Sequence, residues 1–262
     1  MLPLSIRVSN TSIEFNEFEK HFKNSVFSGV EINYSALENI FLKKLTATKK
    51  LKITNLIDLF PAKTLNSFTS CTEGFKKQLY ESIYKKISET SEIPAKHITL
   101  DFDLPSHKKN SQENDEKIKL IKKLNVSLYH SNRILNIPLS IPSDEDHNNL
   151  TYMLSLMQEF MSSHIRVILN VYPHSFKEMS KIDEFLSKIR FDVDMIRLIY
   201  SPETGNYLSL VIIKLWFQKL LNCGFNGDII FVPQTQNIAL FFREVEFLSE
   251  VIYSIQYYIN PS

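Results

Sequence analysis

Glycine is scarce in this sequence, with five residues among 262. No stretch matches GxGxxG or GxxxxGK[ST], the patterns whose backbone amides wrap a phosphate group. We therefore expect no nucleotide cofactor held in that way.

Cysteine is rarer still, because the chain carries only Cys71 and Cys223. Neither belongs to a CxxC pair or to a metal-binding spacing, and two thiols do not make a disulfide framework. The first residues, MLPLSIRVSN, lack the basic start and the apolar run of a signal peptide. The sequence therefore predicts a cytoplasmic protein in a reducing compartment.

An excess of charge of either sign is also missing, since the formal net charge is +1. Such a chain has no overall field to attract nucleic acid or anionic lipid. The most apolar stretch, residues 207–221, is interrupted by Lys214 and is too short to cross a bilayer. We expect no nucleic-acid partner and no membrane partner, and a small-molecule substrate or ligand instead.

What the chain does contain is a clear alternation of apolar and polar residues at residues 96–107, KHITLDFDLPSH. A period of two is typical of a β-strand whose faces meet different environments. One face is apolar, and the other carries Asp101 and Asp103, which a dry core does not accept unpaired. A strand with an acidic inner face that breaks at Pro105 fits one wall of a β/α barrel, where active sites lie at the carboxyl ends of the strands.

Seven further strands alternate with helical patterns along the chain. We expect the eight strands at residues 4–8, 29–33, 51–59, 96–107, 133–141, 165–172, 195–200 and 228–232. No linker rich in Pro, Gly or Ser interrupts the series. The sequence predicts an α/β fold in which residues 1–262 form a single (β/α)8 TIM barrel, and a doubly wound sheet is the competing alternative.

The C-terminal segment contains an apparent ninth strand at residues 255–259. However, the apolar residues from Phe241 to Ile259 recur at steps of three and four, which is the spacing of one helical face. We therefore expect a long helix at residues 238–259 that closes the barrel against the first strand.

Two short motifs resemble the xylose isomerase-like barrels, which are sugar isomerases and epimerases with apurinic endonucleases as relatives. SGVEIN at residues 28–33 resembles the second strand of that family. LLNCGFNGDIIF at residues 220–231 resembles the helix, turn and strand that lead into its last metal ligand. The resemblance implies a TIM barrel that isomerises or epimerises a small sugar or polyol at a divalent metal.

Most metal-ligand positions of that family are not matched here. The resemblance places the last-strand Glu near Val232 and the seventh-strand His near Arg197. The sixth-strand D-x-x-H pattern meets Val171 and His174, and the fifth-strand Glu falls in residues 136–142, which contain no acid. The divalent metal that the resemblance implies therefore lacks most of its expected ligands, and no metal-binding residue is assigned.

Polar residues near the expected carboxyl ends of the strands form the candidate site. Four of them combine carboxylates with imidazoles, which can supply a general acid and a general base: Asp101, Asp103, His107 and His174. The candidate substrate-binding residues are Glu31, Asn33, Asn170, Tyr172, Arg197, Glu203 and Gln234. Loop capping and solvation explain the catalytic set equally well, and Glu203 could simply cap the helix that follows it.

Arg7 and Arg197 fall on the inner faces of the expected first and seventh strands. Buried charges must be paired, so we expect these arginines to pair with Glu31 or Asp101. An internal network of arginines and carboxylates is the favoured interpretation for Arg7, Glu31 and Arg197.

Three functions fit these observations. The first is an isomerase, epimerase or related lyase that acts on a small polar substrate by acid–base chemistry at the mouth of the barrel. The second is a non-catalytic barrel that has lost the metal site and binds a ligand or a protein partner. The third, a nuclease-like relative, ranks last because no basic groove is visible. Fold alone does not choose among them, so whether the chain is an enzyme stays open at this point.

The helix expected within residues 207–221 is apolar around nearly its whole circumference. A large apolar patch in water is rare on soluble monomers. Either the last helix or a loop covers the remainder, or a second copy of the chain does so in a homodimer centred on this helix.

Overall fold

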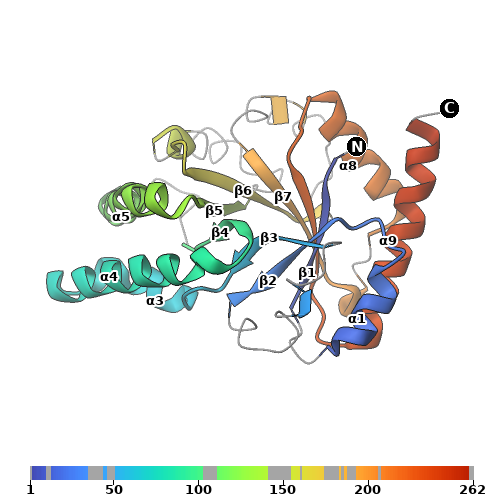
Figure 1. Cartoon of the computed structure of the whole chain (residues 1–262). Coiled ribbons are helices and arrows are strands. Elements are labelled where there is room, and N and C mark those ends of the chain that lie inside the picture. The colour runs from blue at the N-terminus through green and yellow to red at the C-terminus, as the bar shows by residue number, and fades with distance from the viewer. Residues whose placement is uncertain are drawn as a thin grey trace.

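Eight parallel strands form a closed barrel in sequence order, and β1 pairs with β8 to complete the ring (Figure 1). The structure is a computed structural model that describes residues 2–9, 13–34, 44–45, 51–102, 111–140, 155–159, 161–173, 183, 186–187, 193–205 and 208–259. The strands are β1 (Leu4–Val8), β2 (Gly29–Asn33), β3 (Lys52–Ile57), β4 (Ala95–Thr99), β5 (Ile134–Ser140), β6 (Ile165–Val171), β7 (Val193–Tyr200) and β8 (Asp228–Pro233).

Helices surround the strand ring (Figure 1). The α-helices described are α1 (Phe15–Phe22), α3 (Ala62–Asn66), α4 (Glu73–Glu89), α5 (Ser111–Ser131), α8 (Leu210–Asn222) and α9 (Ile238–Ile259). Short 3-10 helices are η2 (Ser67–Ser70), η3 (Thr90–Glu92) and η6 (Pro202–Thr204). α1 and α9 lie side by side on one flank of the barrel, so the first and last helices are neighbours, as the first and last strands are.

The closed parallel barrel confirms the predicted (β/α)8 fold and excludes the doubly wound alternative. β1 and β2 begin and end at the predicted residues, because period-two alternation marks both segments. Residues 255–259 lie within α9 and not in a strand, so the long C-terminal helix is also confirmed.

The strand predicted at residues 96–107 is shorter than expected. β4 begins at Ala95 and ends at Thr99. The alternation nevertheless continues beyond the paired segment, because Leu100 and Phe102 remain buried while Asp101 is partly exposed. The pattern therefore predicted which side chains are buried in the outer apolar core better than it predicted where strand pairing stops.

The helix expected within residues 207–221 begins at Leu210. The Ser209 hydroxyl accepts a hydrogen bond from the backbone N–H of Ile212 at 3.3 Å, which caps the first turn of α8. The preceding Pro202–Thr204 segment forms the separate helix η6, which ends at Gly205 in the left-handed region (φ 80°).

Alternation along the strands sends side chains into two separate cores. The outer faces pack against the helices in one continuous apolar cluster. A smaller apolar cluster fills the inside of the ring on the β6 to β8 side, and it consists of Ile168, Met195, Ile199, Ile230 and Val232. The inner faces of β1 to β4 carry polar groups instead, among them Arg7, Glu31, Asn55 and Thr99. Arg197 on β7 reaches these polar groups from across the ring, so the polar site lies between the β1 to β4 side and β7.

α8 buries one face against the barrel and leaves several apolar side chains elsewhere on its surface exposed. Its buried side chains are Ile213, Trp216, Phe217 and Leu220. Val211 is 72% exposed, and Leu210 and Leu221 are close to 40% exposed at 39% and 41%. Within the described chain, no helix combines the length and the hydropathy that crossing a membrane requires.

The homodimer through residues 207–221 stays a prediction, and Val211 is the residue that tests it best. If a second copy covers this edge of α8, Val211→Glu places a charge in an apolar interface and dissociates the dimer. Sedimentation velocity at micromolar concentration measures the outcome. Val126→Glu on α5, where Val126 is 65% exposed, is the matched control. A monomeric wild-type chain contradicts the interface.

Gly29 sits where three strands approach closely, and Gly29→Ala tests that packing. A Cβ atom at Gly29 would lie 2.4 Å from Thr54 Cγ2 and 2.7 Å from Ser5 Oγ. We expect a loss of about 1–3 kcal/mol in the free energy of unfolding, because overpacking forces its neighbours apart. Urea denaturation measures it. Gly74→Ala in α4 is the control, since nothing lies within 4 Å of its Cβ position, and it should leave stability unchanged or slightly higher.

Candidate functional site

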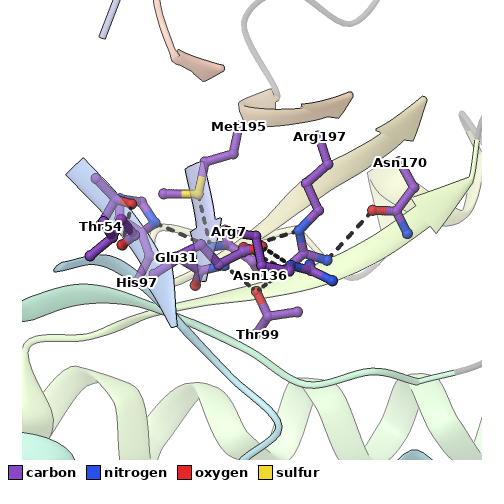
Figure 2. Close-up of polar contacts among 11 residues, drawn as sticks. Arg7, Glu31, Thr54, His97, Thr99, Asn136, Asn170, Met195 and Arg197 are labelled. Atoms are coloured by element: carbon purple, nitrogen blue, oxygen red, sulfur yellow. Dashed lines mark hydrogen bonds and ion pairs between the residues drawn. The ribbon is translucent and has the colours of Figure 1, made fainter. Parts of the chain in front are cut away.

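Glu31 on β2 lies at the centre of an ion-pair network inside the barrel (Figure 2). Its Oε1 accepts a hydrogen bond from Arg7 Nε at 2.6 Å. Its Oε2 accepts from Arg197 Nη2 at 2.7 Å and from Arg197 Nε at 3.0 Å. The Glu31 and Arg197 side chains are 0% and 2% exposed, whereas Arg7 is 21% exposed. Two cations therefore share one carboxylate, and the internal network expected from the sequence is confirmed.

Neutral polar groups complete the network. Asn55 Nδ2 donates to Glu31 Oε2 at 2.6 Å and to Thr99 Oγ1 at 2.8 Å. Arg197 Nη2 also donates to Thr99 Oγ1 at 3.2 Å, and Arg197 Nη1 donates to Asn170 Oδ1 at 3.5 Å. Figure 2 shows the Arg197 guanidinium between the Asn170 amide and the Glu31 carboxylate. The contacts link β2, β3, β4, β6 and β7, so the network spans the interior of the ring.

Burial alone would raise the pKa of Glu31, because the barrel interior removes water from its carboxylate. The charges of Arg197 and Arg7, together with hydrogen bonds from Arg197 and Asn55, oppose this effect and lower the pKa from 4.5 to about 2. Glu31 is therefore ionised at neutral pH. Its chemical role is to hold two guanidinium groups in place, and not to transfer protons.

Two carboxyl groups meet where β3 and β4 end. These strands pair in parallel with Leu56 opposite Ile98, so Asp58 and Asp101 leave adjacent strand ends close to each other. The Asp101 carboxylate is close enough to affect the ionisation of Asp58. Partial burial and then the negative charge of Asp101 raise the pKa of Asp58, while Arg7 and Arg197 act in the opposite direction. Such a pair can hold one proton between two carboxyl groups, so that one member donates while the other accepts.

Asp58 occupies the left-handed region of backbone conformation, with φ 55°. This conformation is unfavourable for most residues, but aspartate adopts it more readily than others. It turns the chain sharply one residue after β3 ends at Ile57. The turn keeps the Asp58 carboxyl group beside the strand end, close to Asp101.

Buried amide oxygens inside the barrel lack a hydrogen-bond donor among the described residues: Asn33 Oδ1, Asn55 Oδ1 and Asn136 Oδ1. For Asn136, exchanging the amide oxygen and nitrogen positions would give the oxygen a partner. The oxygen would then lie near His97 Nδ1, which is 3.3 Å from the present Nδ2 position. Asn55 cannot be reversed, since its Nδ2 already donates to the Glu31 carboxylate. An unpaired buried acceptor of this kind favours a donor from water or from a ligand hydroxyl group.

The other predicted binding residues follow the strand ends without joining the network. Asn33 is the last residue of β2, Tyr172 follows β6 and is 41% exposed, and Gln234 follows β8 and is exposed. Glu203 does not cap a helix that follows it. Its Oε1 accepts hydrogen bonds from Thr235 Oγ1 at 2.5 Å and from the backbone N–H of Gln236 at 3.3 Å, so it anchors the loop that leads into α9.

Three of the four predicted catalytic residues, Asp103, His107 and His174, lie outside the described residues, so their convergence with Asp101 stays a prediction. Asp58 and Asn55 were not among the predicted site residues. Each carried a signal, because both are polar residues within the apolar segment expected at residues 51–59. The apolar residues of that segment indicated the strand, and Asn55 marked its inner face. Asp58 lies after the strand end and reaches the site through its left-handed backbone, which alternation does not predict.

The strand ends do not fit the divalent metal that the family resemblance implies. The inner positions at the carboxyl ends of β5 to β8 carry Ser140, Asn170, Arg197 and Val232. These supply a hydroxyl, an amide, a cation and a hydrocarbon, whereas divalent metals prefer carboxylates and imidazoles. Nowhere in the described parts of the chain do three or more His, Cys, Asp or Glu residues gather in a way that could hold a metal ion. No chemical step is therefore assigned to a metal.

Because of this network, the free energy of unfolding should depend on the Glu31 carboxylate and should fall at low pH. Glu31→Gln should lower the free energy of unfolding at pH 7 by about 3–5 kcal/mol, because it leaves two guanidinium groups without their anion. The folded pKa of about 2 lies below the unfolded value of 4.5, so this stabilisation is present above pH 4.5 and is lost as the pH falls toward 2. The wild type should lose about 3 kcal/mol over that interval from this group, and the variant should not.

Urea denaturation across this pH range measures both quantities. Glu246→Gln changes an exposed hydrogen bond between Glu246 Oε1 and His21 Nδ1 at 2.9 Å and serves as the control with little effect. Equal acid sensitivity of the wild type and Glu31→Gln contradicts the assignment.

Comparisons with known proteins find similar folds among solved structures but no similar sequence among the protein-family models or the curated proteins. The structure is similar to that of 3-keto-D-glucoside 4-epimerase from E. coli, with 14% identity, a TM-score of 0.65, and coverage of 95% of this chain and 99% of the other.

Two further solved structures show the same likeness. A xylose isomerase domain protein from Planctomyces limnophilus shares 10% identity, with a TM-score of 0.65 and coverage of 98% and 97%. A family 2 AP endonuclease from Brucella melitensis shares 9% identity, with a TM-score of 0.66 and coverage of 95% and 99%. At these identities the likeness concerns the fold: this chain has the (β/α)8 barrel of the xylose isomerase-like isomerases and epimerases.

Proposed function

We propose that the chain is a cytoplasmic isomerase or epimerase that acts on a small sugar or polyol derivative at the carboxyl-end mouth of the barrel. The reaction is a proton transfer at a carbon next to a carbonyl group. The neighbouring carboxyl groups of Asp58 and Asp101, at the adjacent ends of β3 and β4, carry the proposal, because they offer a proton acceptor and a proton donor in one place.

The proposed chemistry uses each member of the pair once. The deprotonated carboxylate removes the proton from the carbon beside the carbonyl group, which leaves an enediolate. When a proton returns to the former carbonyl carbon and the hydroxyl proton moves from one oxygen of the enediolate to the other, an isomerisation is complete. A proton returned to the opposite face of the same carbon completes an epimerisation. Arg7 and Arg197 are close enough to affect the pKa of Asp58, so their positive charges can stabilise the negative enediolate oxygen.

The acceptor groups of the interior support a substrate rich in hydroxyl groups. Asn33 Oδ1 and Asn55 Oδ1 lack donors among the described residues, and sugar hydroxyls are donors of the right kind. Structural neighbours such as 3-keto-D-glucoside 4-epimerase act on sugars, which is consistent with this class. Asp103, His107, His174, Tyr172 and Gln234 remain proposed contributors at the same mouth.

Solvent deuterium exchange tests the reaction on many candidate sugars at once. The protein is incubated in D2O with a panel of ketoses, aldoses and keto-glycosides, and NMR follows loss of the proton beside the carbonyl group. We expect exchange into at least one sugar, and we expect it to persist in EDTA. Asp58→Asn and Asp101→Asn should each lower the exchange rate by at least about 100-fold, as removal of an acid–base group does.

A carboxylate at the other end of the barrel provides the control. Asp194 begins β7 at the amino end, so Asp194→Asn should leave the exchange rate unchanged. Exchange that requires added Mn2+, or that survives both mouth substitutions, contradicts the carboxyl-pair mechanism. Elemental analysis of the purified protein adds an independent check on bound metal.

A non-catalytic ligand-binding barrel is the second candidate. The apolar cluster inside the ring favours it, because Val232 stands near the position where the related barrels carry a metal-binding Glu. This candidate predicts that a sugar stabilises the chain in a thermal-shift measurement while no proton exchanges. Binding and exchange measured on the same panel separate the two functions.

A further inference from the structure

A cavity of about 120 Å3 lies on the flank of the barrel beside α1, outside the ring of strands and separate from the mouth. Its wall is aromatic, since Phe18, Phe22 and Phe27 are at least 95% buried and belong to the outer apolar core. Leu45 and Leu51 extend the apolar lining, and Phe15 is partly exposed at it. The proposed proton transfer makes no use of this cavity.

The aromatic rings around the cavity are packed in geometries that a further aromatic ring could extend. Phe18 and Phe22 stack with their centroids 4.0 Å apart, and Phe22 and Phe27 are tilted at 6.1 Å. Aromatic groups add favourable interactions of this geometry in addition to the burial of apolar surface. A closed apolar cavity of roughly 150 Å3 holds a benzene ring. This cavity is somewhat smaller, at about 120 Å3, but it is partly open to solvent, so it can take a single ring or a short acyl chain whose polar end extends outward.

The rim of the cavity carries one charged residue of each sign, and a further cation lies nearby. Lys23 and Glu19 line it, and the Lys44 ammonium group lies 5.8 Å from the centre of the Phe15 ring. Lys23 is exposed, and among the described residues its ammonium group forms no ion pair, not even with Glu19 one helical turn away. Lys23 at the rim and Lys44 beside Phe15 together outnumber the single anion Glu19 at this end of the cavity, which complements one negative charge at the outer end of an apolar ligand.

We propose that this cavity is a second binding site for a small aromatic or short-chain monocarboxylate. The ring or chain occupies the space between Phe18, Phe22 and Phe27, and the carboxylate faces Lys23. Site and ligand class are independent of the sugar proposed for the barrel mouth.

Three probes of equal size and different charge test the ligand class: benzoate, benzyl alcohol and benzylammonium. Isothermal titration calorimetry should give benzoate a dissociation constant on the order of 1 mM, in keeping with the affinity that so few atoms can supply. Benzyl alcohol should bind several-fold more weakly, and benzylammonium at least about tenfold more weakly. Lys23→Glu should weaken benzoate about tenfold without loss of folding, because Lys23 is exposed.

A cavity-filling variant tests the location. Leu51→Trp should fill the space and abolish benzoate binding, while Val211→Trp on α8 adds the same surface far from the cavity and should leave binding unchanged. If Leu51→Trp does not fold, NMR contacts between benzoate and the phenylalanine rings of the wild type decide the location instead. No binding of benzoate at 10-fold the expected dissociation constant, equal binding of benzylammonium, or full binding in folded Leu51→Trp each overturns the proposal.

Discussion

The carboxylate of Glu31 is shared by two guanidinium groups at the centre of the barrel, and the arrangement of the interior depends on this contact. A buried carboxylate needs positive partners, and a buried guanidinium needs acceptors. Arg197, which is 2% exposed, therefore extends across the ring to Glu31, and Asn55 and Thr99 occupy the remaining hydrogen-bonding positions. The polar half of the interior is assembled around one negative charge.

This arrangement separates two kinds of carboxyl group. Glu31 is held ionised by its neighbours, whereas Asp58, at the mouth and beside Asp101, has a raised pKa. The first is suited to fixing the positions of cations, and the second to moving a proton. The same two arginines take part in both environments, because they bond to Glu31 and also lower the pKa of Asp58. The network and the proposed acid–base pair are therefore electrostatically connected.

The sequence predicted the fold more completely than the site. Strand alternation and the three–four spacing of the tail are local patterns, and they gave β1, β2 and α9 with their observed bounds. The pairing of Arg7 and Arg197 with Glu31 followed from the rule that buried charges need partners. Which carboxyl group faces Asp101 depends on strand register and on the left-handed backbone of Asp58, and neither can be read from local spacing. The role of Glu203 was missed for the same reason, since its partner Thr235 lies across a loop.

The ion pair between Glu31 and Arg197 joins residues 166 positions apart in the sequence. Glu31 belongs to the first quarter of the ring and Arg197 to the last, so the carboxyl-terminal half of the barrel cannot neutralise the buried guanidinium of Arg197 with a carboxylate of this network. An amino-terminal half-barrel would bury a carboxylate with Arg7 as its main counter-ion, and a carboxyl-terminal half would bury a guanidinium with no carboxylate of the network. During synthesis, the chain therefore cannot complete this core until β7 has left the ribosome. Water is then excluded from the barrel interior only late in folding, when the last strands join the ring.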